Sequence, residues 1–210
     1  MSVPAADFET IFPANGFDYS IVPLPRRLRD GYLSSKQEVE IMAHLAKMGK
    51  PHCVFEFGTF EGFTALTLAM NTPADTKVYT LDLPAGKPRT HFQADGRNIH
   101  YMTKKELLVF KGTEYEEKIV PLLGDSATFD YSPFAHQMDF IFVDACHTYE
   151  YVKNDSEKAF GMLKKGGLIL WHDYNAGHWD GVVRYLDELS RERKLYHITG
   201  TYFVVYLDNE

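Results

Sequence analysis

Hydrophobic residues gather in short runs that alternate with helix-like patterns over most of the chain. The runs are CVFEF at 53–57, KVYTL at 77–81, KIVPLL at 118–123, DFIFV at 139–143 and LILWH at 168–172. Four of the five lack a regular alternation of apolar and polar residues, as expected of strands that are buried on both faces. Because helical patterns lie between the runs, the chain predicts a parallel sheet with crossover helices.

The helical patterns and the end of the chain complete this prediction. Ser35 and Glu38 fit a capping box that begins a helix, and Gly49 and Pro51 end it. Further helices are expected over 64–70, 151–163 and 182–189. The runs LYHIT and TYFVVYL, on either side of Gly200, predict two strands joined by a tight turn. We therefore predict a three-layer, Rossmann-like α/β fold with seven strands.

Two segments do not follow the alternation. Residues 1–34 are rich in proline and aromatic residues without periodicity, and we expect an irregular N-terminal arm whose basic cluster, residues 26–29, lies in solvent. Residues 84–117 form an insert between the second and third strands that is far longer than the roughly 2–6 residues usual in such units. We expect the insert to cover a substrate site, and we assign residues 35–210, insert included, to one domain.

Composition and charge exclude several classes of protein. The chain has 210 residues, a formal net charge of -7 and two cysteines, so neither a disulfide framework nor a nucleic-acid partner is expected. Its first residues lack the pattern of a signal peptide, and no apolar stretch is long enough to span a membrane. We therefore expect a cytoplasmic protein without a membrane partner. The sequence leaves open whether it forms a homo-oligomer.

A glycine-containing turn follows the first predicted strand. The run EFGTFEG at 56–62 places Gly58 and Gly62 four residues apart, which lets the backbone turn sharply and pass close beneath a flat ligand. A dinucleotide site would normally have a third glycine and a surface suited to a pyrophosphate. This run instead carries carboxylates at Glu56 and Glu61, which suit a ligand with positive charge, such as S-adenosylmethionine with its sulfonium and ammonium groups. We expect that cofactor to be bound by Glu56, Gly58, Thr59 and Gly62.

Acidic residues also follow the second and third strands. Asp82 comes 20 residues after Gly62 and can accept hydrogen bonds from both hydroxyls of a ribose. In the run GDS at 124–126, Asp125 can accept a hydrogen bond from the amino group of an adenine, with Ser126 beside it. That run alone is as typical of a turn or a helix cap. The order of carboxylates along three strand ends favours a nucleoside site.

Two aspartates and two histidines follow the fourth and fifth strands. The carboxyl ends of parallel strands surround a common crevice, so Asp144, His147, His172 and Asp173 are expected to converge there. Asp144, His172 and Asp173 could supply oxygen, nitrogen and oxygen ligands to a divalent metal such as Mg or Mn. The alternative is a hydrogen-bonded cluster that only shapes the pocket.

His147 is the candidate general base. Its ordinary pKa near 6.5 lets it take a proton from an acceptor oxygen near neutral pH. The alternative role is a cap or a packing residue at the start of the next helix. We expect His147 and Asp144 to be the catalytic residues.

Together these segments resemble a known family. VFEFGTFEG, VYTLD, LLGDS, DFIFVDACHTYE and LKKGGLILWHDY, in this order and spacing, resemble the class I S-adenosylmethionine-dependent methyltransferases. Within these they are most similar to the branch called methyltransferase domain 24, related to macrocin-type sugar O-methyltransferases and cephalosporin-hydroxylase-like proteins. The resemblance covers about residues 35–205 and is weakest in the insert. It implies a mostly parallel sheet whose last strand inserts antiparallel.

The resemblance also implies roles for single residues. It places Glu56, Gly58 and Gly62 against the methionine part of the cofactor, Asp82 against the ribose and Asp125 against the adenine. It places Asp144 and the pair His172-Asp173 where metal-dependent relatives keep their ligands. His172 stands where those relatives commonly have a carboxylate, so this chain departs from their ligand pattern.

We therefore expect a methyltransferase that uses S-adenosylmethionine and acts on a hydroxyl of a small molecule. Two other classes stay open. The first is a non-catalytic protein of the same fold that binds S-adenosylmethionine or a nucleoside. The second is a nicotinamide-dependent oxidoreductase, which the missing third glycine disfavours.

Overall fold

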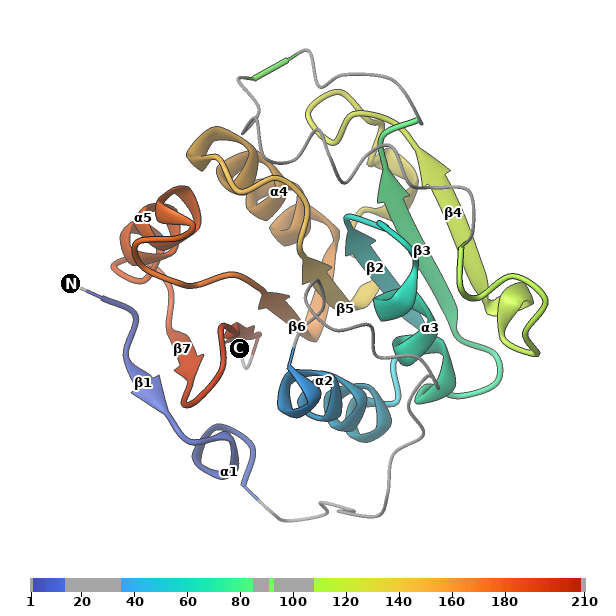
Figure 1. The fold of residues 1–210 in the computed structure, drawn as a ribbon, viewed down its shortest axis with the longest axis horizontal. Helices are drawn as coiled ribbons and strands as arrows, with labels where there is room; N and C mark the ends of the chain where they lie inside the picture. The colour runs from blue at the N-terminus through green and yellow to red at the C-terminus, as the bar shows by residue number, and fades with distance from the viewer. Residues whose placement is uncertain (1, 14–34, 85–90, 93–107, 209–210) are drawn as a thin grey trace.

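The computed structural model describes residues 2–13, 35–84, 91–92 and 108–208. Eight strands in this part of the chain form one sheet in the order β1-β7-β8-β6-β5-β2-β3-β4 (Figure 1). They are β1 (Ala5–Ala6), β2 (Cys53–Phe57), β3 (Lys77–Asp82), β4 (Ile119–Leu123), β5 (Met138–Val143), β6 (Leu163–Trp171), β7 (Leu195–Ile198) and β8 (Val204–Leu207). β8 runs antiparallel to both of its neighbours, β6 and β7, and the other neighbouring strands are parallel.

Helices cover both faces of the sheet. The α-helices of the described residues are α1 (Phe8–Ile11), α2 (Lys36–Gly49), α3 (Phe63–Met70), α4 (Tyr149–Met162) and α5 (Asp180–Leu189), with short 3-10 helices at Glu116–Lys118 and Ser132–Phe134. α4 and α5 pack on one face, and α1, α2 and α3 pack on the other (Figure 1). The fold is thus a three-layer α/β sandwich, as the sequence predicted.

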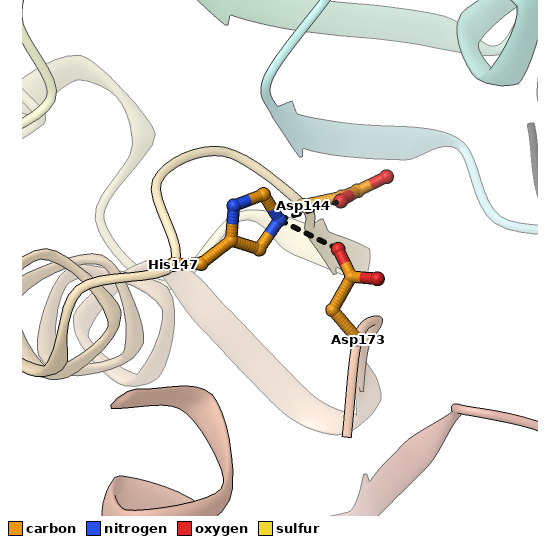
Figure 2. Close-up of side chains that lie close together, drawn as sticks. All are labelled: Asp144, His147 and Asp173. Carbon is orange, nitrogen blue, oxygen red and sulfur yellow. Dashed lines mark hydrogen bonds and ion pairs between the residues drawn. The ribbon is translucent and has the colours of Figure 1, made fainter. Parts of the chain in front are cut away.

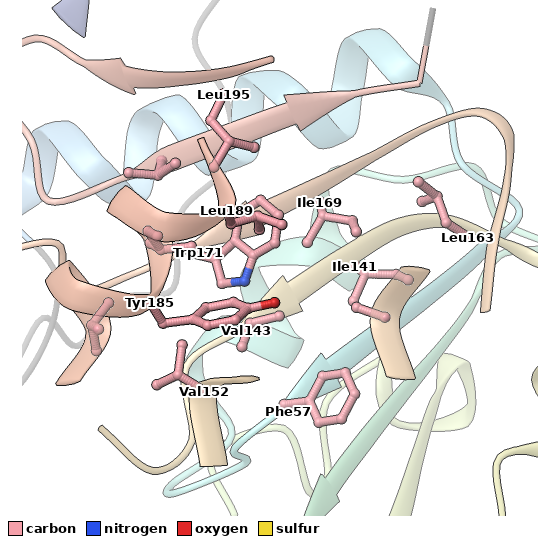
Figure 3. Close-up of a cluster of buried hydrophobic side chains, with 14 of the residues drawn as sticks. Phe57, Ile141, Val143, Val152, Leu163, Ile169, Trp171, Tyr185, Leu189 and Leu195 are labelled. Atoms are coloured by element: carbon pink, nitrogen blue, oxygen red, sulfur yellow. The ribbon is translucent and has the colours of Figure 1, made fainter. Parts of the chain in front are cut away.

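Two apolar cores hold these layers together. Phe57, Ile141 and Trp171 pack under α4 and α5 (Figure 3), whereas Val54 and Phe142 pack under α2 and α3. Successive residues of a strand point to opposite faces, so each central strand feeds both cores and needs apolar residues at nearly every position. This explains why the central strands read as unbroken hydrophobic runs. β4 lies at the edge of the sheet and is half exposed.

All seven predicted strands form, with two differences in the sheet. β6 begins at Leu163, five residues earlier than predicted, because it follows directly on α4. β1 is an eighth strand inside the segment 1–34 that we expected to be irregular, and it pairs with the otherwise open edge of β7. Two residues are too few to show a period in the sequence. The basic cluster at 26–29 lies outside the described residues, as does most of the insert at 84–117.

The predicted capping box of α2 is confirmed. The Ser35 hydroxyl accepts a hydrogen bond from the Glu38 N–H at 3.2 Å, and the Glu38 carboxylate accepts one from the Ser35 N–H at 2.7 Å. Such a cap stabilises a helix by about 1 kcal/mol. It also fixes Glu38 at the edge of the sheet, next to residues of the candidate site.

The topology brings the predicted site residues to one edge. β2 leads on to β3 and β4 on one side, and the chain then returns to form β5 and β6 on the other side. Ligands of such sheets bind outside the carboxyl ends of the strands at this switch point, here between β2 and β5. Among the described residues, no helix is long and apolar enough to cross a bilayer.

Candidate active site

Two glycines shape the loop after β2. Gly58 has φ +94° and Gly62 has φ +79°, values that L-residues with a side chain rarely adopt. A Cβ at Gly58 would lie 2.1 Å from the carbonyl oxygen of Asp144, and a Cβ at Gly62 would lie 2.6 Å from the ring of Phe110. The Cβ positions of both glycines are thus taken up by neighbouring parts of the chain, and at Gly58 the loop backbone is in direct contact with the end of β5.

A buried carboxyl group lies beneath this loop. Glu56 is 1% exposed, and it accepts a hydrogen bond from the Thr80 hydroxyl. The Thr59 hydroxyl lies 2.6 Å from that of Thr80, so the three side chains form one hydrogen-bonded row. Burial raises the pKa of Glu56 well above its usual range, and the nearby carboxylates of Asp144 and Asp82 raise it further against the lowering by Thr80. An approaching positive charge would relieve this repulsion.

Asp82 organises the same loop. One of its carboxylate oxygens accepts the Phe60 N–H at 3.0 Å and the other accepts the Leu83 N–H at 2.7 Å. Asp82 therefore holds the loop after β2 through one carboxylate oxygen and the end of β3 through the other.

Asp125 and Ser126 follow β4. The Tyr151 hydroxyl donates to the carboxylate of Asp125 at 3.1 Å and 3.2 Å to its two oxygens. The Phe92 ring of the insert lies against the Tyr151 ring, with 5.2 Å between their centroids. The carbonyl oxygen of Ser126 accepts the Tyr131 hydroxyl at 2.9 Å. Part of the insert is thus in contact with the end of the proposed nucleoside site.

Three side chains converge after β5 and β6 (Figure 2). The Nε2 atom of His147 lies 2.6 Å from an oxygen of Asp173 and 4.0 Å from an oxygen of Asp144. One ligand atom from each residue can be chosen so that all three lie within 4.8 Å of one another. Hydrogen bonding to His147 and His172 holds the pKa of Asp173 well below its usual range despite burial. The His147–Asp173 contact is therefore a charge-assisted hydrogen bond in which Nε2 donates.

Stacking fixes the imidazole ring of His147. The indole of Trp179 lies parallel to it, with 3.9 Å between the ring centroids and an interplanar angle of 21°. The Nδ1 atom is buried and has no hydrogen-bond partner within the described part of the chain. Gly181 allows this arrangement, because a Cβ there would lie 2.3 Å from the carbonyl oxygen of His147. The ring thus presents one nitrogen, Nε2, to the carboxylates.

His172 lies on the other side of the carboxylates. Its Nδ1 is 3.4 Å from Asp173 and 3.7 Å from Asp144, and its Nε2 is 3.5 Å from Glu38. Burial lowers the pKa of His172, but Asp144, Asp173 and Glu38 outweigh burial and raise it well above its usual value. The three carboxyl groups around His172 therefore favour its protonated form.

The predicted metal ligands are Asp144, His172 and Asp173. The group whose ligand atoms meet most compactly shares both aspartates with that set and has His147 as its imidazole. His172 has the strand parity of Phe142, whose side chain packs toward α2, and this turns its ring toward Glu38. Both histidines thus contact the aspartates, His147 through Nε2 and His172 through Nδ1.

The structure adds residues that sequence reasoning missed. Thr80 joins Glu56 to Thr59, and Glu38 contacts His172. Thr80 could have been found as a polar residue inside an apolar strand, two positions before Asp82. Glu38 gave no signal of a second role, because the capping box already accounted for its presence. Trp171 and Cys146, which lie next to site residues in the sequence, are buried core residues.

Comparison with known proteins agrees with this geometry. Residues 55–174, more than half of the chain, match the model of a family described as methyltransferase domain, Methyltransf_24. The match begins in β2 and ends directly after Asp173, so it contains the whole set of convergent side chains. It favours a methyltransferase over the nicotinamide-dependent oxidoreductase.

Relatives and solved structures give the same class. Over 149 residues the chain is 28% identical to caffeoyl-CoA O-methyltransferase of Stellaria longipes, which covers 69% of this chain and 54% of that protein. The chain thus spans about half the length of the curated relatives it matches.

Among solved structures, the O-methyltransferase TomG of Streptomyces achromogenes in complex with SAM superposes with a TM-score of 0.57, at 18% identity over 83% of this chain and 81% of that one. An O-methyltransferase of Bacillus cereus in complex with SAH gives a TM-score of 0.57, at 16% identity over 88% of this chain and 84% of that one. Both show that the fold is that of the class I methyltransferases. With its family match and this fold, the chain belongs to the methyltransferase domain family.

Proposed function

We propose that this chain is an S-adenosylmethionine-dependent O-methyltransferase that acts on a hydroxyl of a small molecule. The observation that carries the proposal is the convergence of Asp144, His147 and Asp173 beside the Gly58 loop, in a chain of the methyltransferase family. Residues 35–210, with the insert at 84–117, form the catalytic domain in this proposal.

The residues at the carboxyl ends of β2, β3 and β4, called the β2 side, support binding of the cofactor. Glu56 is buried near the carboxylates of Asp144 and Asp82, and this mutual repulsion favours a cationic ligand. In this proposal Asp82 accepts hydrogen bonds from ribose hydroxyls and Asp125 accepts one from the adenine amino group. When bound, S-adenosylmethionine supplies an activated methyl group on a sulfonium. The protein then has to align an acceptor oxygen with that methyl group and take up the proton of the oxygen.

The residues of the β5–β6 side also fit a divalent metal. Two carboxylates and one imidazole, with ligand atoms within 4.8 Å, are the donor types that Mg or Mn accept. Asp144, His147 and Asp173 would hold the ion, which would lower the pKa of a bound hydroxyl. His147 would bind through Nε2, the nitrogen that faces both aspartates.

Without a metal, the same nitrogen serves as the base. For Nε2 to accept a proton, the ring proton must be on Nδ1 and the bond to Asp173 must open. Asp173 then keeps a cationic partner, because its other oxygen is 3.4 Å from His172. An acceptor hydroxyl that enters between Asp144 and His147 can take the place of Asp173 at Nε2. The proton of the acceptor oxygen then ends on His147.

The test is turnover of S-adenosylmethionine to S-adenosylhomocysteine against a panel of phenols, sugars and polyketide-like alcohols, with calorimetry of S-adenosylhomocysteine binding. We expect S-adenosylhomocysteine to bind, and we expect part of the panel of acceptors to be methylated. Treatment with EDTA distinguishes the two forms of chemistry. Loss of activity that Mg or Mn restores supports a metal, and unchanged activity supports His147 as base.

Two outcomes would contradict the proposal. Absence of binding would exclude the cofactor. Binding without turnover of any acceptor, together with unchanged binding in Asp144→Ala and His147→Gln, would favour a non-catalytic protein of the same fold.

A further inference from the structure

The backbone of Asp173 has an unfavourable conformation. Its φ is +64°, in the left-handed region that residues with a side chain seldom occupy unless the surrounding structure holds them there. The next N–H but one, that of Asn175, donates to the carbonyl oxygen of Asp173 at 2.7 Å. This tight turn directs the carboxylate toward Nε2 of His147. Whatever holds the turn also sets the geometry of the proposed site.

Tyr174 anchors the far side of this turn. Its N–H donates to the carbonyl oxygen of Tyr202 at 3.0 Å, and its hydroxyl donates to the carboxylate of Asp187 on α5 at 2.6 Å. The same hydroxyl oxygen accepts a hydrogen bond from the Val3 N–H at 3.1 Å. The backbone and the side chain of Tyr174 therefore both form hydrogen bonds within the protein. These bonds connect the turn to Tyr202 and to α5.

The third element is the N-terminal segment. The Val3 N–H also donates to Asp187 at 3.1 Å, and the Val3 side chain is 4% exposed in the core under α5. Residues 4–6 continue along β7, where the carbonyl oxygen of Pro4 accepts the His197 N–H at 2.9 Å and that of Ala6 accepts the Thr199 N–H at 3.1 Å. Val3, 171 residues from Tyr174 in the sequence, is thus part of the support of the turn.

We propose that residues 3–6, through the Val3 N–H and the Tyr174 hydroxyl, hold Asp173 in the strained turn that places its carboxylate against His147. Val3 and Tyr174 are positioning residues, since neither touches the convergent side chains. The kinetic part of this inference rests on the proposed function, whereas its structural part does not. Without the support, the turn relaxes toward negative φ and the Asp173 carboxylate leaves Nε2.

Tyr174→Phe tests the hydroxyl, with Tyr206→Phe as a matched control. Tyr206 is also half-buried and donates its hydroxyl to an aspartate, Asp208, at 3.2 Å, but it lies on β8. The first measurement is hydrogen exchange of the Asn175 amide by NMR. We expect its protection to fall about tenfold in Tyr174→Phe and to stay unchanged in Tyr206→Phe, while amides of β5 stay protected in both.

Val3→Pro tests the N-terminal donor, with Val3→Ala as its control. Proline removes the N–H, whereas alanine removes only the buried methyl groups. We expect Val3→Pro to reproduce the loss of protection at Asn175 and Val3→Ala to leave it intact.

Kinetics form the second readout. In Tyr174→Phe and Val3→Pro we expect kcat to fall about tenfold to a hundredfold, because a displaced carboxylate spoils alignment. The Kd of S-adenosylhomocysteine should stay within about twofold of the wild-type value, since the β2 side is untouched. A purely structural role would change Tm without this difference between kcat and Kd.

The exchange measurement separates this inference from the proposed function. If wild-type protein methylates no acceptor but Asn175 loses protection in Tyr174→Phe and Val3→Pro, the function fails and the positioning role stands. If wild-type protein is active and Asn175 exchanges equally in each variant and its control, the positioning role is wrong.

Discussion

At the carboxyl end of the sheet, the carboxyl groups of the two halves have different kinds of hydrogen-bond partner. On the β2–β4 side, Glu56, Asp82 and Asp125 receive hydrogen bonds from threonine and tyrosine hydroxyls and from backbone N–H groups. On the β5–β6 side, the two aspartates face two imidazoles. In these contacts the first half has only neutral donors, whereas the second half has His172, whose pKa the surrounding carboxyl groups raise.

This difference separates two tasks. Carboxyl groups without a cationic partner suit the binding of a cationic cofactor, and carboxylates paired with imidazoles suit the movement of a proton. We therefore expect substitutions on the β2–β4 side to change affinity and those on the β5–β6 side to change turnover.

The largest effect is expected for Asp144→Ala. Loss of this carboxylate removes a group that would hold either the acceptor hydroxyl or a metal, so we expect kcat to fall about 10²-fold to 10⁴-fold. The Kd of S-adenosylhomocysteine should stay within about threefold. The control is Asp139→Ala, which removes a carboxylate from the opposite end of β5, where it accepts the N–H groups of His52 and Cys53. A large change in this Kd for Asp144→Ala would contradict the separation of cofactor binding and turnover between the two sides.

Gly58→Ala should damage both halves at once. Its Cβ would overlap the Asp144 carbonyl oxygen, so the loop and the end of β5 have to move apart, at a cost of about 3 kcal/mol in the free energy of unfolding. Thermal and urea unfolding measure this cost, and both Kd and kcat should worsen. Gly166→Ala is the control, because Gly166 also has a positive φ, +80°, but open space around it. Equal destabilisation by the two substitutions would mean that φ, and not the contact, matters.

Asp82→Ala should weaken cofactor binding with a smaller effect on turnover. The carboxylate supports the loop through the Phe60 N–H and, in the proposed function, accepts the ribose hydroxyls, so we expect the Kd of S-adenosylhomocysteine to rise about tenfold to a hundredfold. At saturating S-adenosylmethionine, kcat should stay within about threefold. Asp75→Ala is the control, since Asp75 has a 71% exposed side chain before the start of β3. Unchanged affinity in Asp82→Ala would remove the assignment of the ribose site.

The smallest effect concerns pH and His172. Its pKa is raised in the folded protein, so the folded state binds a proton that the unfolded state releases above its ordinary pKa of 6.5. The stabilisation is therefore complete below that pKa and is lost as pH rises through the folded pKa. Urea unfolding with EDTA present should show that His172→Gln is most destabilising at the acid end of this window. A difference from wild type that grows with pH would contradict the assigned charge.

Much of the fold could be predicted because it depends on local patterns. The runs at 53–57 and 139–143 are apolar on both faces, and the Ser35–Glu38 box begins α2 as its residue types require. β1 escaped prediction because its pairing depends on an open edge of β7 far along the chain. The early start of β6 was not predicted, because Lys164, Lys165 and the two glycines after them lack the apolar pattern of a buried strand.

The site was predictable in its residues and less so in its arrangement. Parallel strands necessarily bring Asp144, His147, His172 and Asp173 to one edge. The direction of each side chain depends on features that composition does not carry, namely the left-handed turn at Asp173 and the strand parity that sends His172 toward Glu38. The same holds for Gly58, whose neighbour is the Asp144 backbone.

The contact of Gly58 with the end of β5 has a consequence for how such enzymes diversify. In the proposed function, the loop at the cofactor and the strand end that carries Asp144 are in backbone contact, so a shift of one displaces the other. Variants with new acceptor preferences are therefore expected to retain a glycine at this position.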